Sequence, residues 1–208
     1  MRLLAALILL VQAPPDKWEK EIAAFEAKDK EKPPAPGGIV FVGSSTIRLW
    51  KTAEDFAGLP VINRGFGGSM IADSARYAER VVIPYKPRQV LLYAGGNDIS
   101  SKKTPEQVFA DYQAFVAKVH AALPETKIWF MSLFPTVKRA ADDDKVRALN
   151  ALIAAHAKSN PRLGFIEVAS ALSPDGKANP ENLRPDGIHL SEKGYGIIAP
   201  IVKKAIAP

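Results

Sequence analysis

Five short apolar segments alternate with longer amphipathic patterns along this chain, and this alternation restricts the fold more than any other feature. The apolar segments are rich in β-branched and aromatic residues, which is typical of strands. The patterns between them repeat apolar residues every three or four positions, as helices packed on a sheet do. Strands separated by helices form a parallel sheet covered on both faces, so the sequence predicts a three-layer α/β/α sandwich. The expected strands cover residues 39–43, 60–63, 89–94, 127–133 and 163–168.

The first expected strand ends at a glycine that is followed by two serines. Ile39 to Val42 are apolar without alternation, as in a strand buried on both faces, and Gly43, Ser44 and Ser45 come next. Open α/β sheets bind ligands at this carboxyl edge, so a serine here is well placed to act as a nucleophile. Serine is also a favoured helix N-cap. The segment alone therefore leaves a nucleophile and a capping residue as alternatives.

Glycine-rich turns also follow the second and third expected strands. Residues 64–69 read Arg-Gly-Phe-Gly-Gly-Ser, and residues 95–98 read Gly-Gly-Asn-Asp. The first turn fits a dinucleotide-binding fingerprint poorly, because Met70 stands where the third glycine belongs. We therefore expect these glycines to let the backbone approach a different anion closely.

A short loop before the last amphipathic segment contains both Asp186 and His189. This spacing allows a carboxylate to orient one imidazole nitrogen while the other accepts a proton, as a general base requires. His120 and His156 lie within amphipathic patterns without such a partner, and we expect them to be surface or packing residues. A serine, an oriented histidine and several N–H donors form the set that acyl transfer needs. The G-x-S-x-G elbow of α/β-hydrolases is absent.

Four blocks in order resemble those of the SGNH hydrolases, in the GDSL-type esterase/lipase superfamily. The nearest resemblance is to the bacterial branch that is similar to platelet-activating-factor acetylhydrolase and lysophospholipase-like esterases. The resemblance implies a flavodoxin-like five-stranded parallel sheet of order 2-1-3-4-5 and a reaction without metal or organic cofactor. The blocks, within residues 39–196, are Phe-Val-Gly-Ser-Ser-Thr, Asn-Arg-Gly-Phe-Gly-Gly-Ser, Tyr-Ala-Gly-Gly-Asn-Asp and Asp-Gly-Ile-His-Leu-Ser.

The same resemblance implies a role for individual residues. It makes Ser45 the nucleophile, with Asp186 and His189 as its partners. It makes the Ser45 N–H, the Gly68 N–H and the Asn97 side chain the donors of an oxyanion hole. Ser44 departs from the family, which usually has aspartate before its serine.

The sequence therefore predicts a serine ester hydrolase whose partner is a small-molecule or carbohydrate ester. We expect short acyl groups such as acetyl, because no stretch of the sequence indicates a long apolar groove. A lysophospholipase or lipase-type esterase is the alternative. The Ser44 departure also leaves open a non-catalytic carbohydrate-binding relative.

The first residues are typical of an export signal. Arg2 precedes an apolar run from Leu3 to Val11, which is far shorter than the ~20 residues that span a bilayer, and small Ala13 follows. An uncleaved anchor or a core helix is the alternative. We expect a signal peptide at 1–13, an N-terminal helix and Pro/Gly linker at 14–38, and the hydrolase domain at 39–208. The mature protein would be periplasmic or extracellular, without stable membrane insertion.

Charge and composition exclude several classes of protein. The net charge of +6 is modest, and basic pairs such as 102–103, 138–139 and 203–204 are dispersed, so we interpret them as solvated surface and expect no nucleic-acid partner. The absence of cysteine excludes disulfides and thiolate metal sites. The acidic run at 142–144 is interpreted as a complement to a helix dipole, and we expect no metal.

Overall fold

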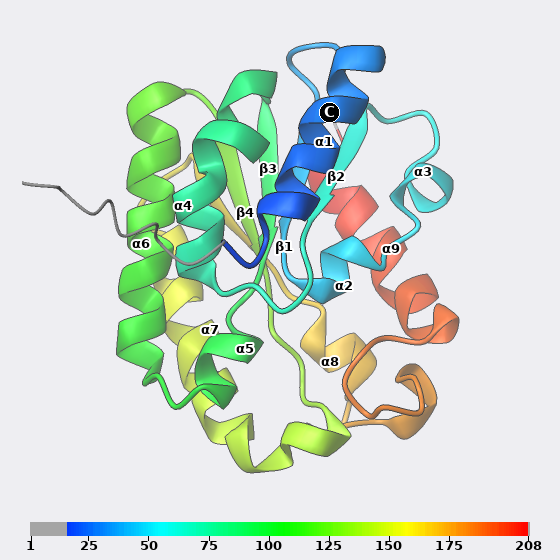
Figure 1. Ribbon diagram of the computed structural model, residues 1–208. Helices are drawn as coiled ribbons and strands as arrows, with labels where there is room; N and C mark the ends of the chain where they lie inside the picture. Colours follow the sequence, from blue (N-terminus) through cyan, green and yellow to red (C-terminus); the bar gives the residue numbers. More distant parts are fainter. Residues whose placement is uncertain (1–15, 208) are drawn as a thin grey trace, which may run out of the picture.

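Five parallel strands form a single sheet in the computed structural model, which describes residues 16–207 (Figure 1). Their order is β2-β1-β3-β4-β5, which confirms the expected topology. Each predicted strand is present, although the last three end one or two residues earlier than predicted. The signal peptide predicted at 1–13 lies outside the described residues. The strands are β1 (Ile39–Gly43), β2 (Val61–Gly65), β3 (Gln89–Tyr93), β4 (Lys127–Met131) and β5 (Leu163–Ile166).

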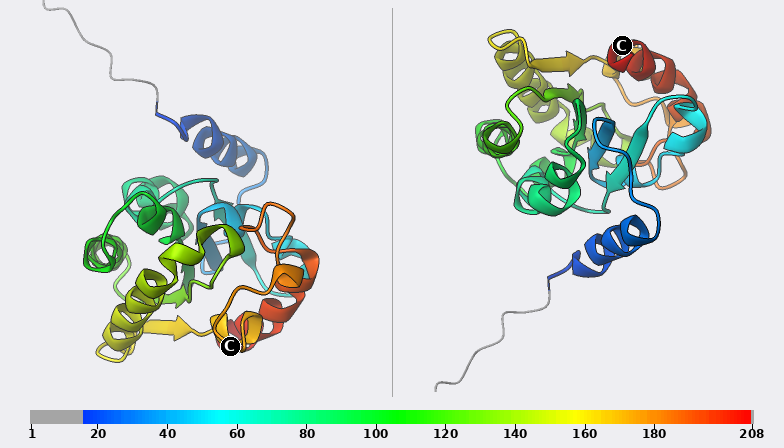
Figure 2. Two further views of the ribbon diagram at one scale, coloured as in Figure 1. Left: turned by 90° about the horizontal axis from the view of Figure 1, so that it is seen from below. Right: turned by 90° about the horizontal axis from the view of Figure 1, so that it is seen from above.

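Helices cover both faces of the sheet, as the two further views show (Figure 2). One face carries α4 (Ile71–Val81), α6 (Pro105–Ala122) and α7 (Asp143–Ala157), which pack side by side. The other carries α9 (Glu192–Ile206) together with α2 (Ser45–Arg48), α3 (Thr52–Asp55) and α8 (Ala169–Leu172). The remaining elements are α1 (Glu19–Glu31), α5 (Gly96–Ser100), η1 (Ile83–Tyr85), η2 (Val137–Asp142) and η3 (Pro180–Asn182). Over residues 16–207, no helix has the length and apolar character needed to cross a bilayer.

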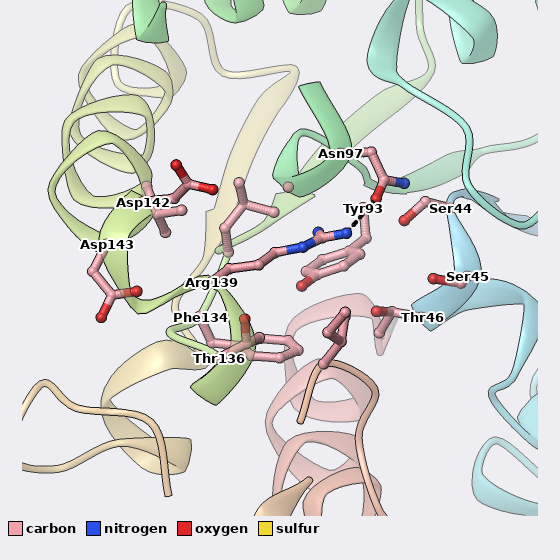
Figure 3. Close-up of a pocket in the computed structure, with 14 residues that line it drawn as sticks. Ser44, Ser45, Thr46, Tyr93, Asn97, Phe134, Thr136, Arg139, Asp142 and Asp143 are labelled. Atoms are coloured by element: carbon pink, nitrogen blue, oxygen red, sulfur yellow. Dashed lines mark hydrogen bonds between the residues drawn. The ribbon is translucent and has the colours of Figure 1, made fainter. Parts of the chain in front are cut away.

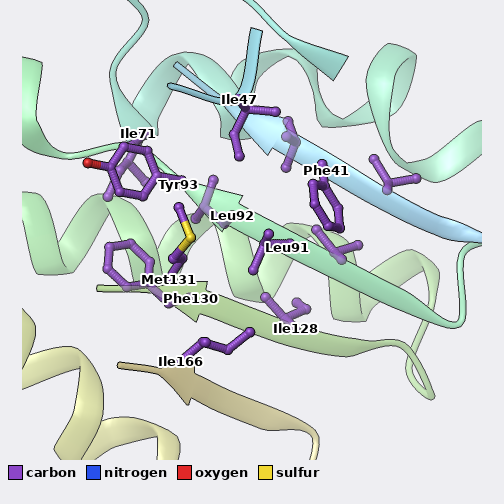
Figure 4. Close-up of a cluster of buried hydrophobic side chains, with 14 of the residues drawn as sticks. Phe41, Ile47, Ile71, Leu91, Leu92, Tyr93, Ile128, Phe130, Met131 and Ile166 are labelled. Atoms are coloured by element: carbon purple, nitrogen blue, oxygen red, sulfur yellow. The ribbon is translucent and has the colours of Figure 1, made fainter. Parts of the chain in front are cut away.

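The core lies between the sheet and its helices, and it is built from the strand residues predicted to be buried (Figure 4). All five residues of β1 are buried, which explains why this strand shows no polar alternation. Phe41 packs edge to face on Phe56, with ring centroids 4.9 Å apart. Burying each such side chain contributes about 1.5–3 kcal/mol. The buried strands therefore fix the positions of the residues that directly follow their carboxyl ends.

Local signals in the sequence explain where the long helices begin. Thr104 caps α6 by accepting from the Gln107 N–H, and the Gln107 side chain accepts from the Thr104 N–H, which together form a capping box. Ser191 caps α9, since its hydroxyl accepts from the Gly194 N–H. The acidic run at 142–144 lies at the start of α7, which fits the helix-dipole interpretation.

The N-terminal helix α1 docks on the sheet domain beside α4. Ile22 is fully buried, and Trp18 and Phe25 pack against the core, so one apolar stripe of the helix faces the domain. The Arg80 guanidinium binds the carboxylates of Glu19 and Glu26, each at 2.7 Å. Apolar contact and ion pairs thus fix α1, and the residues just before it, against the loop that follows β2.

Candidate active site

Ser45 stands at the carboxyl end of β1, where the backbone turns sharply into α2. Gly43 has a φ of +139°, and a side chain there would collide with the Tyr93 carbonyl oxygen. The Ser44 N–H donates to that same oxygen at 2.9 Å. Ser44 occupies the N-cap position, but its hydroxyl makes no capping hydrogen bond, and Ser45 is the first helical residue. The capping interpretation therefore does not account for either hydroxyl.

The chain brings Ser45, His189 and Asp186 together in a hydrogen-bonded row. His189 Nε2 lies 2.9 Å from Ser45 Oγ, and His189 Nδ1 lies 2.8 Å from Asp186 Oδ2. The other carboxylate oxygen of Asp186 accepts from the backbone N–H groups of His189 and Ile188, at 2.9 and 2.8 Å. These bonds fix the carboxylate, the carboxylate orients the ring, and the ring faces the serine hydroxyl.

The same contacts set the ionisation of Asp186. Its pKa is held well below its ordinary value, first by the hydrogen bond from the His189 backbone N–H, then by the His189 ring and the Ile188 N–H. The carboxylate is therefore ionised at neutral pH. An ionised acceptor at Nδ1 keeps the proton on that nitrogen and leaves Nε2 free to accept the proton of Ser45.

Asn97 lies on the first turn of α5, directly after β3. Its Nδ2 donates to the Ser69 carbonyl oxygen at 3.0 Å, and its Oδ1 accepts from Arg139 Nη2 at 2.9 Å. A guanidinium only donates, so the contact with Arg139 settles which amide atom is the oxygen. The nitrogen is directed toward Ser44 and Ser45 (Figure 3). One of its two hydrogens remains available on that side.

Gly68 lies in the loop after β2, and this loop has little freedom. Gly68 has a φ of +75°, which favours glycine. A side chain at Gly67 would meet the Arg48 guanidinium at 2.7–2.8 Å. The Phe66 N–H donates to the Gly43 carbonyl, which ties the loop to the turn before Ser45. Gly68 is thus favoured by its positive φ, and Gly65 by close approach, because a side chain there would lie 2.2 Å from the Arg48 backbone nitrogen. The predicted approach of these glycines to an anion stays a prediction.

A small pocket of about 40 Å³ opens beside Ser45 and Asn97 (Figure 3). Tyr93 and Phe134 stack along its wall, with ring centroids 5.6 Å apart. Since roughly 10–15 Å³ is enough for one water, this pocket holds only a group of a few heavy atoms. The aromatic wall had no identifiable signal in the sequence, because Phe134 lies in a loop after β4.

Two polar residues at this site were missed or misread from the sequence. Arg139 was interpreted as solvated surface charge, which is wrong, because its half-buried guanidinium binds Asn97. Trp18 packs against the core, and its indole N–H also donates to the Gly67 carbonyl at 2.9 Å, a contact that the sequence did not predict. Neither contact has a local signal, since both join segments that are remote in sequence.

The two other histidines lie away from Ser45, and the part of the chain that the structure describes offers no candidate metal site. His120 Nε2 contacts the Thr126 carbonyl at 3.0 Å, and His156 packs edge-on against Phe109, so neither lines the pocket at Ser45. Among residues 16–207, no group of three or more histidine and acidic side chains is placed to hold a metal ion.

Comparison with protein families shows where the chain belongs. The model of the GDSL-like lipase/acylhydrolase family matches residues 47–197, beginning just after Ser45. The chain therefore belongs to the GDSL-like lipase/acylhydrolase family, whose members share the SGNH hydrolase architecture, and it is a carboxylic ester hydrolase. A search among curated proteins finds no match.

Solved structures with the same fold include several hydrolases. A GDSL-like lipase from Bacteroides thetaiotaomicron is 22% identical, with a TM-score of 0.77 over 89% of this chain and 96% of that one. A Streptococcus pneumonia protein provisionally described as a platelet activating factor is 21% identical, with a TM-score of 0.81 over 91% and 92%. A catalytic mutant of an acetylxylan esterase from Geobacillus stearothermophilus is 16% identical, with a TM-score of 0.68 over 84% and 96%. At these identities the likeness concerns the fold.

Proposed function

We propose that this protein is an exported serine ester hydrolase that removes short acyl groups, chiefly acetyl, from its substrate. The observation that carries the proposal is the row from Asp186 through His189 to Ser45, with contacts of 2.8 and 2.9 Å. Such a row is the arrangement that activates a serine hydroxyl.

In the proposed reaction, His189 Nε2 takes the Ser45 proton as Ser45 Oγ attacks the ester carbonyl carbon. The tetrahedral intermediate collapses, the C–O bond to the alcohol breaks, and the alcohol leaves with the proton that His189 carried. Water then attacks the acyl-enzyme with His189 as base, and the carboxylic acid departs. Asp186 keeps the ring in one tautomer and stabilises the imidazolium.

The negative charge of the tetrahedral oxygen would be bound by three N–H groups, from Ser45, Gly68 and Asn97. The Ser45 N–H is at the first turn of α2, where helical N–H groups lack intrahelical partners. Asn97 retains one amide hydrogen on the side of the serines. Donors fixed before the reaction stabilise charge without reorganisation, which is why such holes contribute strongly to catalysis.

The preference for a short acyl group rests on the pocket. Its volume of about 40 Å³ suits a small acyl group such as acetyl better than a long chain. The fold neighbours include an acetyl esterase mutant crystallised with acetate and the acetylxylan esterase, which is consistent with this preference. A lysophospholipase or lipase-type activity is the alternative.

A series of p-nitrophenyl esters from acetyl to dodecanoyl, together with acetylated sugars, tests the substrate. We expect kcat/KM to be highest for acetyl and to fall steeply beyond butanoyl. A maximum at eight carbons or more would instead support the lipase-type alternative.

The nucleophile is tested with a fluorophosphonate probe. We expect Ser45 to be labelled, and Ser45→Ala to abolish both labelling and turnover. Ser44→Ala is the matched control, since it removes the neighbouring hydroxyl and should still be labelled. Labelling that survives Ser45→Ala would refute the assignment.

Export is proposed on the sequence of residues 1–13 alone. Mass analysis of the protein from its native host should find a mature chain that begins near residue 14 and lies outside the cytoplasm. An intact Met1 on cytoplasmic protein would contradict export, while leaving the proposed chemistry untouched.

A further inference from the structure

The two oxyanion donors that flank Ser45 share a property that the proposed mechanism has not used. Each donor N–H belongs to an amide group: the Gly67–Gly68 peptide in one case and the Asn97 side chain in the other. In both amides the oxygen accepts a hydrogen bond from a side chain of a remote segment.

Trp18 binds the first of these amides. Its Nε1–H donates to the Gly67 carbonyl oxygen at 2.9 Å, and this oxygen and the Gly68 N–H belong to one peptide plane. The indole is held by edge-to-face contact with Phe66, with ring centroids 5.9 Å apart. This hydrogen bond restricts rotation of the Gly67–Gly68 peptide plane, and it therefore limits the directions in which the Gly68 N–H can point.

Arg139 binds the second amide. Its Nη2 donates to Asn97 Oδ1 at 2.9 Å, and no ion pair of Arg139 is found within residues 16–207. Asn97 Nδ2 is fixed in turn by the Ser69 carbonyl. With both atoms engaged, the carboxamide cannot flip, and its nitrogen stays on the side of Ser44 and Ser45 (Figure 3).

A hydrogen bond to an amide oxygen also changes the amide N–H. It draws electron density toward the oxygen and makes the N–H a stronger donor, by about 10–30% per bond in a chain of such bonds. The Arg139 contact adds a positive charge, and bonds from charged donors are about twice as strong as neutral ones. Both effects grow as negative charge develops on the substrate oxygen.

We propose that Trp18 and Arg139 are positioning residues that orient and polarise the two oxyanion donors, Trp18 from outside the pocket at Ser45 and Arg139 from its wall. The inference rests on the proposed function, because it takes Gly68 and Asn97 to be those donors. It gives Trp18, at the N-cap of α1 and before the residues matched by the family model, a part in catalysis as well as in packing.

Two conservative variants test this. Trp18→Phe removes the N–H and keeps a ring against Phe66, and Arg139→Met removes the donors and keeps the length of the side chain. With p-nitrophenyl acetate, we expect each to lower kcat by about fivefold to tenfold, less than the ~10²–10³ lost when a whole donor is removed. KM should stay within about twofold, and the melting temperature should be unchanged.

The chain offers matched controls. Trp129 Nε1 donates to the amide oxygen of Gln89 at 2.7 Å, and Arg162 donates to the Pro124 carbonyl at 2.6 Å, both away from the pocket. Trp129→Phe and Arg162→Met should therefore leave kcat unchanged. Equal losses in Trp18→Phe and Trp129→Phe, or in Arg139→Met and Arg162→Met, would overturn the inference.

A double-mutant cycle separates this inference from the proposed function. In an Asn97→Ala background, Arg139→Met should cause no further loss, because its target is gone, whereas Trp18→Phe should keep its full effect. A full additional loss from Arg139→Met would overturn the Arg139 role. If Asn97→Ala itself retains wild-type kcat, the assignment of Asn97 as an oxyanion donor fails and the Arg139 role with it, whereas the proposed function fails only if Ser45→Ala retains turnover. If Asn97→Ala lowers kcat but Trp18→Phe and Arg139→Met keep the wild-type kcat, this inference alone fails.

Discussion

The two sides of Ser45 are held in different ways. On one side, Asp186 and His189 lie in a single loop, and every hydrogen bond that fixes the Asp186 carboxylate comes from residues within three positions of it. On the other side, the amides of Gly68 and Asn97 are fixed by Trp18 and Arg139. Those contacts join residues 49 and 42 positions apart in sequence.

This difference indicates how each half of the site responds to change. On the base side, the hydrogen bonds to the Asp186 carboxylate all come from its own loop, and this loop is also tied to η2 by the bond from the Lys138 N–H to the Gly187 carbonyl at 3.1 Å. The oxyanion side depends on the docking of α1 and η2, so substitutions near α1 reach the reaction from outside the pocket, whereas Arg139 of η2 also lines the pocket itself. Turnover should therefore be tuned mainly from the oxyanion side and abolished from either.

The largest effect should come from the base side. Asp186→Asn keeps the shape of the loop but removes the ionised acceptor that sets the histidine tautomer, so kcat should fall by up to roughly 10⁴-fold. Asp175→Asn is the control, since Asp175 accepts from the Lys177 N–H in a comparable turn without a histidine. Turnover of Asp186→Asn within tenfold of wild type would mean that another group orients His189.

The next effect should come from the oxyanion side. Asn97→Ala removes the donor that we propose acts only on the tetrahedral intermediate, so kcat should fall by ~10²–10³, or about 2.7–4 kcal/mol. Steady-state kinetics should find KM nearly unchanged, and calorimetry should find the melting temperature close to wild type. A fall in stability parallel to activity would make Asn97 a turn residue and would remove the contrast between the two sides.

A smaller effect is expected at the boundary between them. Ser44 is buried, but its hydroxyl makes no capping bond, so Ser44→Ala should lower kcat by less than about tenfold. This bound follows from the ~0.5–1.5 kcal/mol that an ordinary hydrogen bond contributes. A loss as large as that of Asn97→Ala, measured with the same ester, would place the Ser44 hydroxyl in the reaction.

The smallest effect concerns how the contribution of Asp186 to stability depends on pH. The pKa of Asp186 is lower in the folded protein than its ordinary value of 3.8, so its ionised form stabilises the fold above that pH. This contribution is lost as the pH falls below 3.8 toward the folded pKa, and solvent screening keeps it small. The difference in melting temperature between wild type and Asp186→Asn should be constant from about pH 5 to 8 and shrink below about pH 4. A constant difference down to pH 2 would contradict the lowered pKa.

Much of the fold could be predicted from the sequence, because its signals are local. The apolar run from Ile39 to Val42, the capping box at Thr104 and the stripe through Ile22 each depend on neighbours in the chain. The strand order came from the family resemblance, since the sequence alone does not say which parallel strands are adjacent. Asp186 and His189 were found for the same reason as the capping box, because both residues of the pair lie in one short segment.

The oxyanion side could be predicted only in part. The glycines and Asn97 can be recognised in the sequence because they directly follow expected strands. Trp18 and Arg139, which donate to the oxygens of these amides, cannot be recognised in this way. Arg139 follows Lys138 in a segment that resembles ordinary polar surface, and only the tertiary fold brings its guanidinium to Asn97. The spacing of four positions between Trp18 and Ile22 indicates that Trp18 packs on the domain. It does not predict a hydrogen bond from the indole N–H to a carbonyl oxygen.

The hydrogen bond between Ser45 and His189 joins residues 144 positions apart, which has a consequence in time. A ribosome makes Ser45, the glycine loop and Asn97 early, and it makes His189 much later. During that interval the growing chain holds a serine without a base. Ester hydrolysis therefore cannot begin until synthesis has passed His189 and the late segment has folded back onto the first strand.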